Sequence, residues 1–244
     1  MDQKTKKKLL ELVKRNYEEI AADFDASRKK ELWPELLKLA GMVKDGDRVL
    51  DAGCGNGRLA GALADKKINY LGVDSSQKLI KFARENYVRE IASSPITAPR
   101  NDKRFLVADI LKLNKLPEKD FDYIFCAAVL HHLPGEDLRL KALEQMKNKL
   151  KPDGKIIITV WNLWSQRKFR KLIFKYGFLK LVGKNKMDFG DILFDWKNSN
   201  GGQASRRYYH AFANGELKKL AAQAGLKINK LYKDEYNYYV IASF

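Results

Sequence analysis

Apolar and polar positions follow two rhythms along this chain. Residues 5–22 carry apolar side chains at helical spacing, which predicts an amphipathic helix, and a shorter helix is expected after Trp33-Pro34. From residue 48 onwards, short apolar runs alternate with helical stretches. The runs lie at 48–51, 70–74, 105–109, 121–126 and 155–160, and the helical stretches at 59–64, 78–87 and about 136–150. This order predicts an α/β fold with a Rossmann-like, doubly wound, mostly parallel sheet.

The end of the chain predicts a different connection. A helical stretch at 214–224 precedes two apolar runs, 227–232 and 236–243, which are separated by a short polar connection. Two strands joined so tightly form an antiparallel hairpin, which we place at the sheet edge and which brings the sheet to seven strands. We expect one domain over 1–244, with N-terminal helices in 1–44, a core in 45–160, an insertion in 161–213 and the last helix and strands in 214–244.

The insertion carries much of the positive charge. The chain has 47 Lys and Arg against 30 Asp and Glu, a net charge of +17, and residues 161–213 contribute +8 of it while also being rich in aromatic residues. Connections this long are usually functional or disordered, and the aromatic content argues against disorder. A surface of this charge attracts phosphate backbones. An anionic membrane and simple solubility are the alternatives.

Other global features narrow the class. No apolar stretch reaches the roughly 18–20 residues of a membrane span, and the N-terminus does not read as a secretory signal. Cys54 and Cys126 are the only cysteines, which excludes a disulfide framework and an all-cysteine metal site. We therefore expect a cytoplasmic protein.

A glycine-rich turn, Asp51-Ala-Gly53-Cys-Gly55-Asn-Gly57, follows the first predicted strand and opens a helix. Its glycines allow a sharp turn and close approach of a ligand to the backbone. The dinucleotide pattern is absent, because Arg58 stands where its third glycine belongs, and no phosphate-binding lysine follows. Asp51 would repel a pyrophosphate and attract a cation. S-adenosylmethionine, which carries an ammonium and a sulfonium but no phosphate, fits these electrostatics.

Two further aspartates end the next predicted strands. Asp74, 23 residues after Asp51, can accept the two hydroxyls of a ribose, and Asp109 can accept from an adenine amino group. Each Asp alone could simply cap the following helix. Three in succession at the carboxyl ends of parallel strands favour a cofactor pocket, to which we also assign Ile110.

These pieces resemble the class I S-adenosylmethionine-dependent methyltransferases. The resemblance covers residues 48–160 and rests on the glycine-rich turn, on Gly72-Val-Asp74, on Val107-Ala-Asp109 and on Leu150-Lys-Pro-Asp-Gly-Lys155. It implies S-adenosylmethionine as the cofactor and is nearly silent on the substrate.

A narrower resemblance lies outside this core. The stretch 17–28 with Trp33-Pro34, the stretch 190–196, and Arg207-Tyr-Tyr-His-Ala-Phe212 with Gly215-Glu-Leu217 are similar to tRNA wobble-uridine methyltransferases, which esterify a 5-carboxymethyl group. The resemblance implies tRNA as a partner and raises a small zinc-binding activator protein as a second one. A carboxymethyl group is already ionised at neutral pH, so no general base is required.

Several residues are candidates for the substrate side. We expect catalytic roles for Arg28, His131, Arg207 and Tyr209, and substrate binding by Arg206, Tyr208 and His210. Arginine forks fit carboxylates and phosphates, and aromatic rings stack on bases. Plain alternatives are a histidine that fills the core, a solvated arginine loop, and a core strand for Tyr208-Tyr209. No metal site is predicted, because no spaced cluster of ligands accompanies the histidines.

Two other functions stay open from the sequence. A small-molecule methyltransferase would be marked by a short, apolar, uncharged insertion, which this chain lacks. A catalytically silent RNA-binding protein would not need the intact acidic and glycine positions of the turn.

Overall fold

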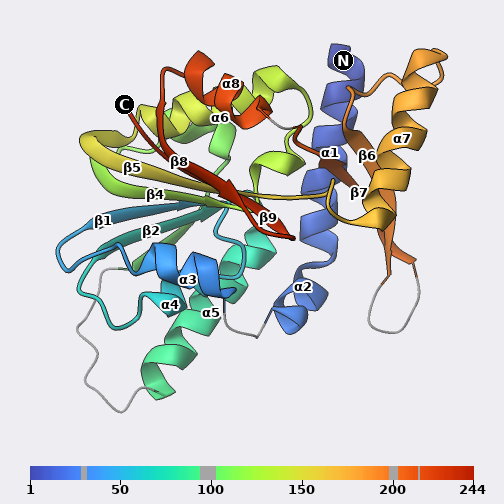
Figure 1. Ribbon diagram of the computed structural model, residues 1–244. Helices are drawn as coiled ribbons and strands as arrows, with labels where there is room; N and C mark the ends of the chain where they lie inside the picture. The colour runs from blue at the N-terminus through green and yellow to red at the C-terminus, as the bar shows by residue number, and fades with distance from the viewer. Residues whose placement is uncertain (29–31, 94–102, 198–202, 214) are drawn as a thin grey trace.

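A seven-stranded sheet forms the centre of the computed structural model, which describes residues 1–28, 32–93, 103–197, 203–213 and 215–244 (Figure 1). The strand order is β3-β2-β1-β4-β5-β9-β8. Their bounds are β1 Arg48–Ala52, β2 Asn69–Asp74, β3 Lys103–Val107, β4 Phe121–Ala127, β5 Leu150–Trp161, β8 Lys227–Lys233 and β9 Asn237–Ser243. Strands β1 to β5 are parallel, and β9 pairs antiparallel with both β5 and β8. The predicted mostly parallel sheet with an antiparallel edge hairpin is confirmed.

Helices cover both faces of this sheet (Figure 1). One face carries α6 (Glu136–Lys147) and α8 (Glu216–Gln223), and the other carries α3 (Pro34–Ala40), α4 (Arg58–Ala62) and α5 (Gln77–Ser93). Successive residues of a strand point to opposite faces, so Leu50 joins the core under α6 and α8 while Val49 joins the core under α3 and α4. Burial on both faces explains why the strands read as nearly continuous apolar runs.

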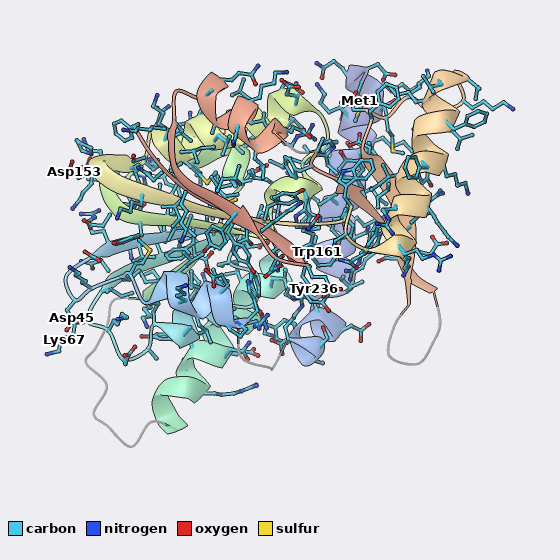
Figure 2. All side chains as sticks on the ribbon, in the orientation of Figure 1. Met1, Asp45, Lys67, Asp153, Trp161 and Tyr236 are labelled. Carbon is cyan, nitrogen blue, oxygen red and sulfur yellow. The ribbon has the colours of Figure 1, made fainter. Side chains whose placement is uncertain are left out.

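The insertion folds into a helix and a hairpin that stand at one end of the strands. The helix is α7 (Arg167–Leu181), and the hairpin pairs β6 (Asp191–Lys197) with β7 (Gln203–His210). Helix α1 (Gln3–Glu19) packs against β7, and α7 packs against β6. In Figure 2, the labels Asp45, Lys67 and Asp153 mark the opposite end of the sheet, whereas Trp161 and Tyr236 lie at the end that faces α1. The insertion and the carboxyl ends of the parallel strands therefore meet.

Three predicted elements differ in detail. The helix expected over 5–22 breaks at Ile20, where α2 (Ala21–Ser27) begins. The third strand ends at Val107, so Asp109 is not its last residue but the N-cap of a 3-10 helix, η1 (Ile110–Lys115). The helix expected at 78–87 extends over the whole of α5. None of the described helices is long and apolar enough to cross a membrane.

We expect Gly53→Ala to destabilise the protein more than Gly46→Ala. Both glycines have a φ near +90°, where an L side chain is strained by about 1–3 kcal/mol. A methyl group on Gly53 would also lie 2.3 Å from Cγ2 of Val129, whereas one on Gly46 meets nothing within 4 Å. Overpacking of this kind adds about 1–3 kcal/mol, which urea unfolding of the two variants would reveal. Equal losses of stability in the two variants would show that the structure around Gly53 relaxes and relieves the contact with Val129.

Candidate functional site

The glycine-rich turn is hydrogen-bonded to the end of β2. The backbone N–H groups of Gly53 and Cys54 donate to the carbonyl of Val73 at 2.8 and 2.9 Å, and the N–H of Gly55 donates to Oδ2 of Asp74 at 3.1 Å. Because β1 and β2 are parallel neighbours, the turn after β1 meets the carboxyl end of β2 directly. These bonds fix the path of the turn and leave its outer side facing an open pocket.

Asp74 faces this pocket with acceptor capacity to spare. Its Oδ1 accepts from the N–H of Ser76 at 2.9 Å, and the N–H of Ser75 also bonds to the carboxylate, whose acceptor sites are not all used by these donors. Burial raises the pKa of Asp74 even though these backbone bonds act to lower it. A carboxylate in this position can accept two hydroxyl groups of a ligand.

Asp51 is the most buried acidic group of the pocket. Its side chain is 2% exposed and accepts a hydrogen bond from the Tyr70 hydroxyl at 2.6 Å. Burial raises its pKa to about 7, although the Tyr70 bond lowers it. A cation bound beside Asp51 would favour the ionised carboxylate, so the site suits a positively charged group.

Asp109 combines the two roles that the sequence left open. It lines the pocket together with Ile110, it caps η1 by accepting from the N–H of Leu111 at 3.0 Å, and it pairs with Nζ of Lys14 at 2.9 Å. Burial opposes its ionisation, but these two partners lower its pKa. Helix α1 therefore closes the pocket on this side.

Helix α2 lies over the glycine-rich turn. Oδ1 of Asp25 accepts from the side-chain amides of Asn56 and Asn86 at 2.9 and 2.8 Å. The Phe24 ring lies 3.4 Å from the point where a Cβ on Gly55 would stand. Arg28 lines the pocket, with its guanidinium 5.1 Å from the centre of that ring. Sequence reasoning noted the stretch 17–28 only through its resemblance and missed Asp25 and Phe24.

Aromatic rings form the opposite wall. His131 and His132 follow β4 in the short 3-10 helix η2 (Leu130–His132), and Trp161 ends β5. The His131 ring is 5.4 Å from Trp161 and 5.1 Å from Tyr209, measured between centroids. The hydroxyl of Tyr17 is bonded to Nε2 of His132 at 2.8 Å. Trp161 is a pocket residue that the sequence reasoning did not select.

The protonation of His131 follows from its surroundings. Its Nδ1 accepts from the backbone N–H of Trp161 at 3.4 Å, so the proton of the neutral ring sits on Nε2. This Nε2 is buried and has no hydrogen-bond partner among the described residues. Burial lowers the pKa of His131 well below its ordinary value and lowers that of His132 to about 3. The pocket wall thus holds a neutral imidazole with one N–H group to offer.

Strand alternation divides the residues predicted on β7. Arg207 and Tyr209 point toward His132, and Nη1 of Arg207 donates to the Tyr209 hydroxyl at 3.4 Å. Neither of them lines the main pocket. Arg207 is 8% exposed and borders a small adjoining cavity with Tyr17 and His132. Both residues therefore support the histidine wall from behind.

The other three residues predicted to bind substrate, Arg206, Tyr208 and His210, point to the opposite side of β7. Tyr208 and His210 are buried and both bond to Oδ1 of Asp191, at 2.8 and 2.7 Å, and His210 also bonds to Glu216 at 2.8 Å. Arg206 lies outside, with Nη2 3.3 Å from the Tyr176 hydroxyl. The predicted substrate binding by Tyr208 and His210 does not agree with this burial, because the network joins the hairpin to α8 away from the pocket.

The pocket lies between the glycine-rich turn, α1, α2 and the histidine wall, and it opens to solvent. No group of three or more His, Cys, Asp or Glu side chains within the described ranges is arranged to hold a metal ion. The spare acceptors of Asp74, the buried Asp51 and the positive-φ turn together fit S-adenosylmethionine.

Comparisons with known proteins show what the chain as a whole is similar to. The profile of a family described as a methyltransferase domain matches residues 50–158. A tRNA (carboxymethyluridine(34)-5-O)-methyltransferase of Schizosaccharomyces pombe is 28% identical over 95% of this chain and 96% of its own length. An Arabidopsis thaliana protein of the same name is 34% identical over 61% of this chain, which spans 32% of that protein.

Solved structures share the fold. A SAM-dependent methyltransferase from Methanosarcina mazei superposes with a TM-score of 0.66 at 21% identity, over 88% of this chain and 98% of that one. A methyltransferase solved in complex with the Trm112 methyltransferase activator of Haloferax volcanii gives a TM-score of 0.62 at 18% identity, over 95% and 96% of the two chains. Residues 50–158 of the chain thus match a methyltransferase domain, and the chain is similar over nearly its whole length to a tRNA carboxymethyluridine methyltransferase.

Proposed function

We propose that this chain methylates tRNA and forms the methyl ester of a 5-carboxymethyl group on the wobble uridine. The names of its relatives support this substrate, including the fission-yeast protein that it matches along 96% of that protein's length. The chemistry of the pocket supports it independently.

The observation that best supports this proposal is that the side chains of the wall formed by Tyr17, His131 and His132 are weak bases. Burial lowers the pKa of both histidines and raises the pKa of Tyr17, so at neutral pH none of the three readily takes a proton from an acceptor. A neutral hydroxyl or an N–H group would have to lose a proton during methylation. A carboxylate is ionised already, with an ordinary pKa near 4, and needs no base.

The residues of this chain then act by holding and aligning. S-adenosylmethionine, when bound, supplies an electrophilic methyl group on a sulfonium. Asp51 would hold its ammonium group and Asp74 its ribose hydroxyls. The Nε2–H of His131 would donate to one oxygen of the substrate carboxylate and leave the other free to attack, and Arg28 would add positive charge at the pocket. Alignment of reacting groups accounts for several kcal/mol of a barrier.

Arg207 and Tyr209 act as positioning residues in this scheme. They contact the histidine wall and do not line the main pocket, so their effect on the substrate passes through His131 and His132. This role replaces the direct catalytic one expected from the sequence.

A small activator protein is a further proposed partner. The Haloferax volcanii complex supports it through the shared fold, and the zinc in such a partner stays a prediction from the sequence resemblance. The cytoplasmic location is likewise a prediction. Methylation assays with and without a candidate activator test the partner.

Labelled methyl transfer tests the function directly. The protein is incubated with methyl-labelled cofactor and with one of two tRNAs that differ only in the wobble nucleoside, carboxymethyluridine or uridine. We expect label in the carboxymethyl tRNA alone, and we expect mild alkali to release it because the product is an ester. Label in the unmodified tRNA, or label that resists alkali, would contradict the proposal.

Cofactor binding should depend on pH through Asp51. In the ligand-free protein this carboxyl has a pKa of about 7, so below pH 7 it carries a proton that must leave before a cation can bind beside it. Affinity for S-adenosylmethionine should therefore fall by up to about tenfold per pH unit below pH 7 and level off above it.

Calorimetric titrations between pH 5.5 and 8.5 measure this dependence. Tyr70→Phe provides a matched variant, since it removes the hydrogen bond that lowers the pKa of Asp51 and should move the midpoint upward. An affinity that does not change with pH in the wild-type protein would mean that Asp51 does not meet a cation.

Replacing His131 with Phe should separate turnover from cofactor binding. A planar ring, somewhat larger than imidazole, is kept and the Nε2–H donor is lost, so single-turnover methylation should slow at least tenfold, or about 1.4 kcal/mol. Cofactor affinity should change less than about twofold, as it depends on the opposite wall. Tyr209→Phe is the control, because it removes one hydroxyl from the same ring cluster and should slow the reaction far less. If His131→Phe methylates at the wild-type rate, the histidine only packs in the core and does not contact the substrate.

A further inference from the structure

The outward side of α7 is apolar where a surface helix is normally polar. The helix buries Phe169 and Ile173 against the hairpin, whereas Phe174 and Phe178 are 67% and 64% exposed and Leu181 is 74% exposed. Residues four apart lie one above the other on a helix, so the two exposed phenylalanine rings are neighbours. Exposed aromatic groups in this arrangement indicate a binding surface.

The same side of α7 is strongly basic. The helix contains no acidic residue and six cationic ones, Arg167, Lys168, Arg170, Lys171, Lys175 and Lys180. Within the described ranges no carboxylate forms an ion pair with any of them. Two of them turn aside: Lys180 bonds to the carbonyl of Met187 at 2.6 Å, and Nζ of Lys168 lies 5.6 and 5.9 Å from the ring centres of Phe169 and Phe194. We call Arg167, Arg170, Lys171, Phe174, Lys175 and Phe178 the α7 outer face.

The inner side of α7 is linked to the site through packed rings. Trp161, which lines the pocket, is 4.9 Å from Tyr209 between ring centroids. Tyr209 stacks on Phe194 at 5.0 Å, and Phe194 meets Phe169 of α7 at 5.2 Å. The α7 outer face is on the opposite side of the helix from Phe169, and Figure 1 shows α7 beside the hairpin, on the outside of the molecule. An RNA with one nucleotide in the pocket can therefore reach this face with nucleotides farther along its chain.

The arrangement of charge and rings distinguishes the possible occupants. With 3.6 residues per turn, Arg167 falls between the lines of Phe174 and Phe178, and Arg170 and Lys171 lie on either side. A helix that lies in a membrane surface has a continuous apolar face, and exposed Leu181, Val182 and Phe189 do extend the apolar surface at the end of α7, but the cations interrupt it around Phe174 and Phe178. A second copy of the chain would bring like charges together. Aromatic rings interleaved with cations are typical of surfaces that bind single-stranded nucleic acid.

We propose that the α7 outer face binds unpaired nucleotides of the anticodon loop other than the target uridine, which occupies the pocket. Phe174 and Phe178 stack on bases, and the flanking Arg and Lys side chains hold phosphates. This inference rests on the proposed function, since that function supplies the RNA.

The test replaces both rings and measures RNA binding without methyl transfer. The probes are anticodon stem–loop RNAs that each carry 2-aminopurine at one unpaired loop position other than the target uridine, and 2-aminopurine fluorescence changes on stacking. The variants of the full chain are Phe174→Ala/Phe178→Ala and Phe174→Leu/Phe178→Leu, the second of which keeps apolar side chains but has no aromatic face. Phe244→Ala is the control, an exposed ring at the C-terminus whose side chain is 49% exposed.

We expect both double variants to bind the RNA at least about tenfold more weakly and to lose the fluorescence change. Phe244→Ala and the cofactor affinity of every variant should match the wild type. Wild-type RNA affinity in both double variants would overturn the inference. A second result would also overturn it: the leucine variant binds RNA like the wild type, and binding to phosphatidylserine vesicles is lost when the rings are removed. That result would mark the face as a membrane surface.

The two proposals fail separately. If the wild-type protein esterifies carboxymethyluridine tRNA while the double variants bind RNA normally, only the role of α7 is wrong. If RNA binding depends on the rings but no tRNA is methylated, the α7 outer face stands as an RNA surface and the proposed reaction is wrong.

Discussion

The hydrogen bonds between the glycine-rich turn and the end of β2 determine the rest of the site. The Val73 carbonyl and the Asp74 carboxylate together hold three successive N–H groups of the turn. Because the turn cannot swing away, Asp51 and Asp74 face one pocket and α4 begins directly after Gly57. The same fixed turn gives α2 a surface to cover, through the bonds of Asp25 to Asn56 and Asn86.

Backbone geometry builds the cofactor wall, and packed rings build the substrate wall. The backbone of β5 reaches into the second wall through the Trp161 N–H, which sets the tautomer of His131. The hairpin of the insertion then presses Tyr209 against both histidines. A fold shared by many methyltransferases is adapted here by an inserted element that supports the wall without lining the pocket.

The sheet and the meeting of Asp51 and Asp74 in one pocket could be predicted because they depend on local sequence. Alternating apolar runs and helices predict a mostly parallel sheet, and parallel strands bring Asp51 and Asp74 to one edge whatever the other contacts are. The substrate side could not be predicted in the same way. Arg206 to His210 are consecutive in sequence, and only their pairing with β6 and packing on α1 decides which side chains face the histidines. Nothing in the sequence around Trp161 distinguishes it as a pocket residue, because it is simply the last residue of its strand. The bonds of Asp25 join residues 31 and 61 positions apart, which local sequence does not reveal.

The central claim is that the target uridine reaches the wall formed by His131 and Trp161. A tRNA with 4-thiouridine in the wobble position, irradiated on the protein together with S-adenosylhomocysteine, measures this most directly, because the crosslink forms only with atoms in contact with the base. We expect mass spectrometry of the digested protein to place the crosslink in the segments 128–133 or 161–164. Crosslinks confined to surfaces outside the pocket would contradict the account.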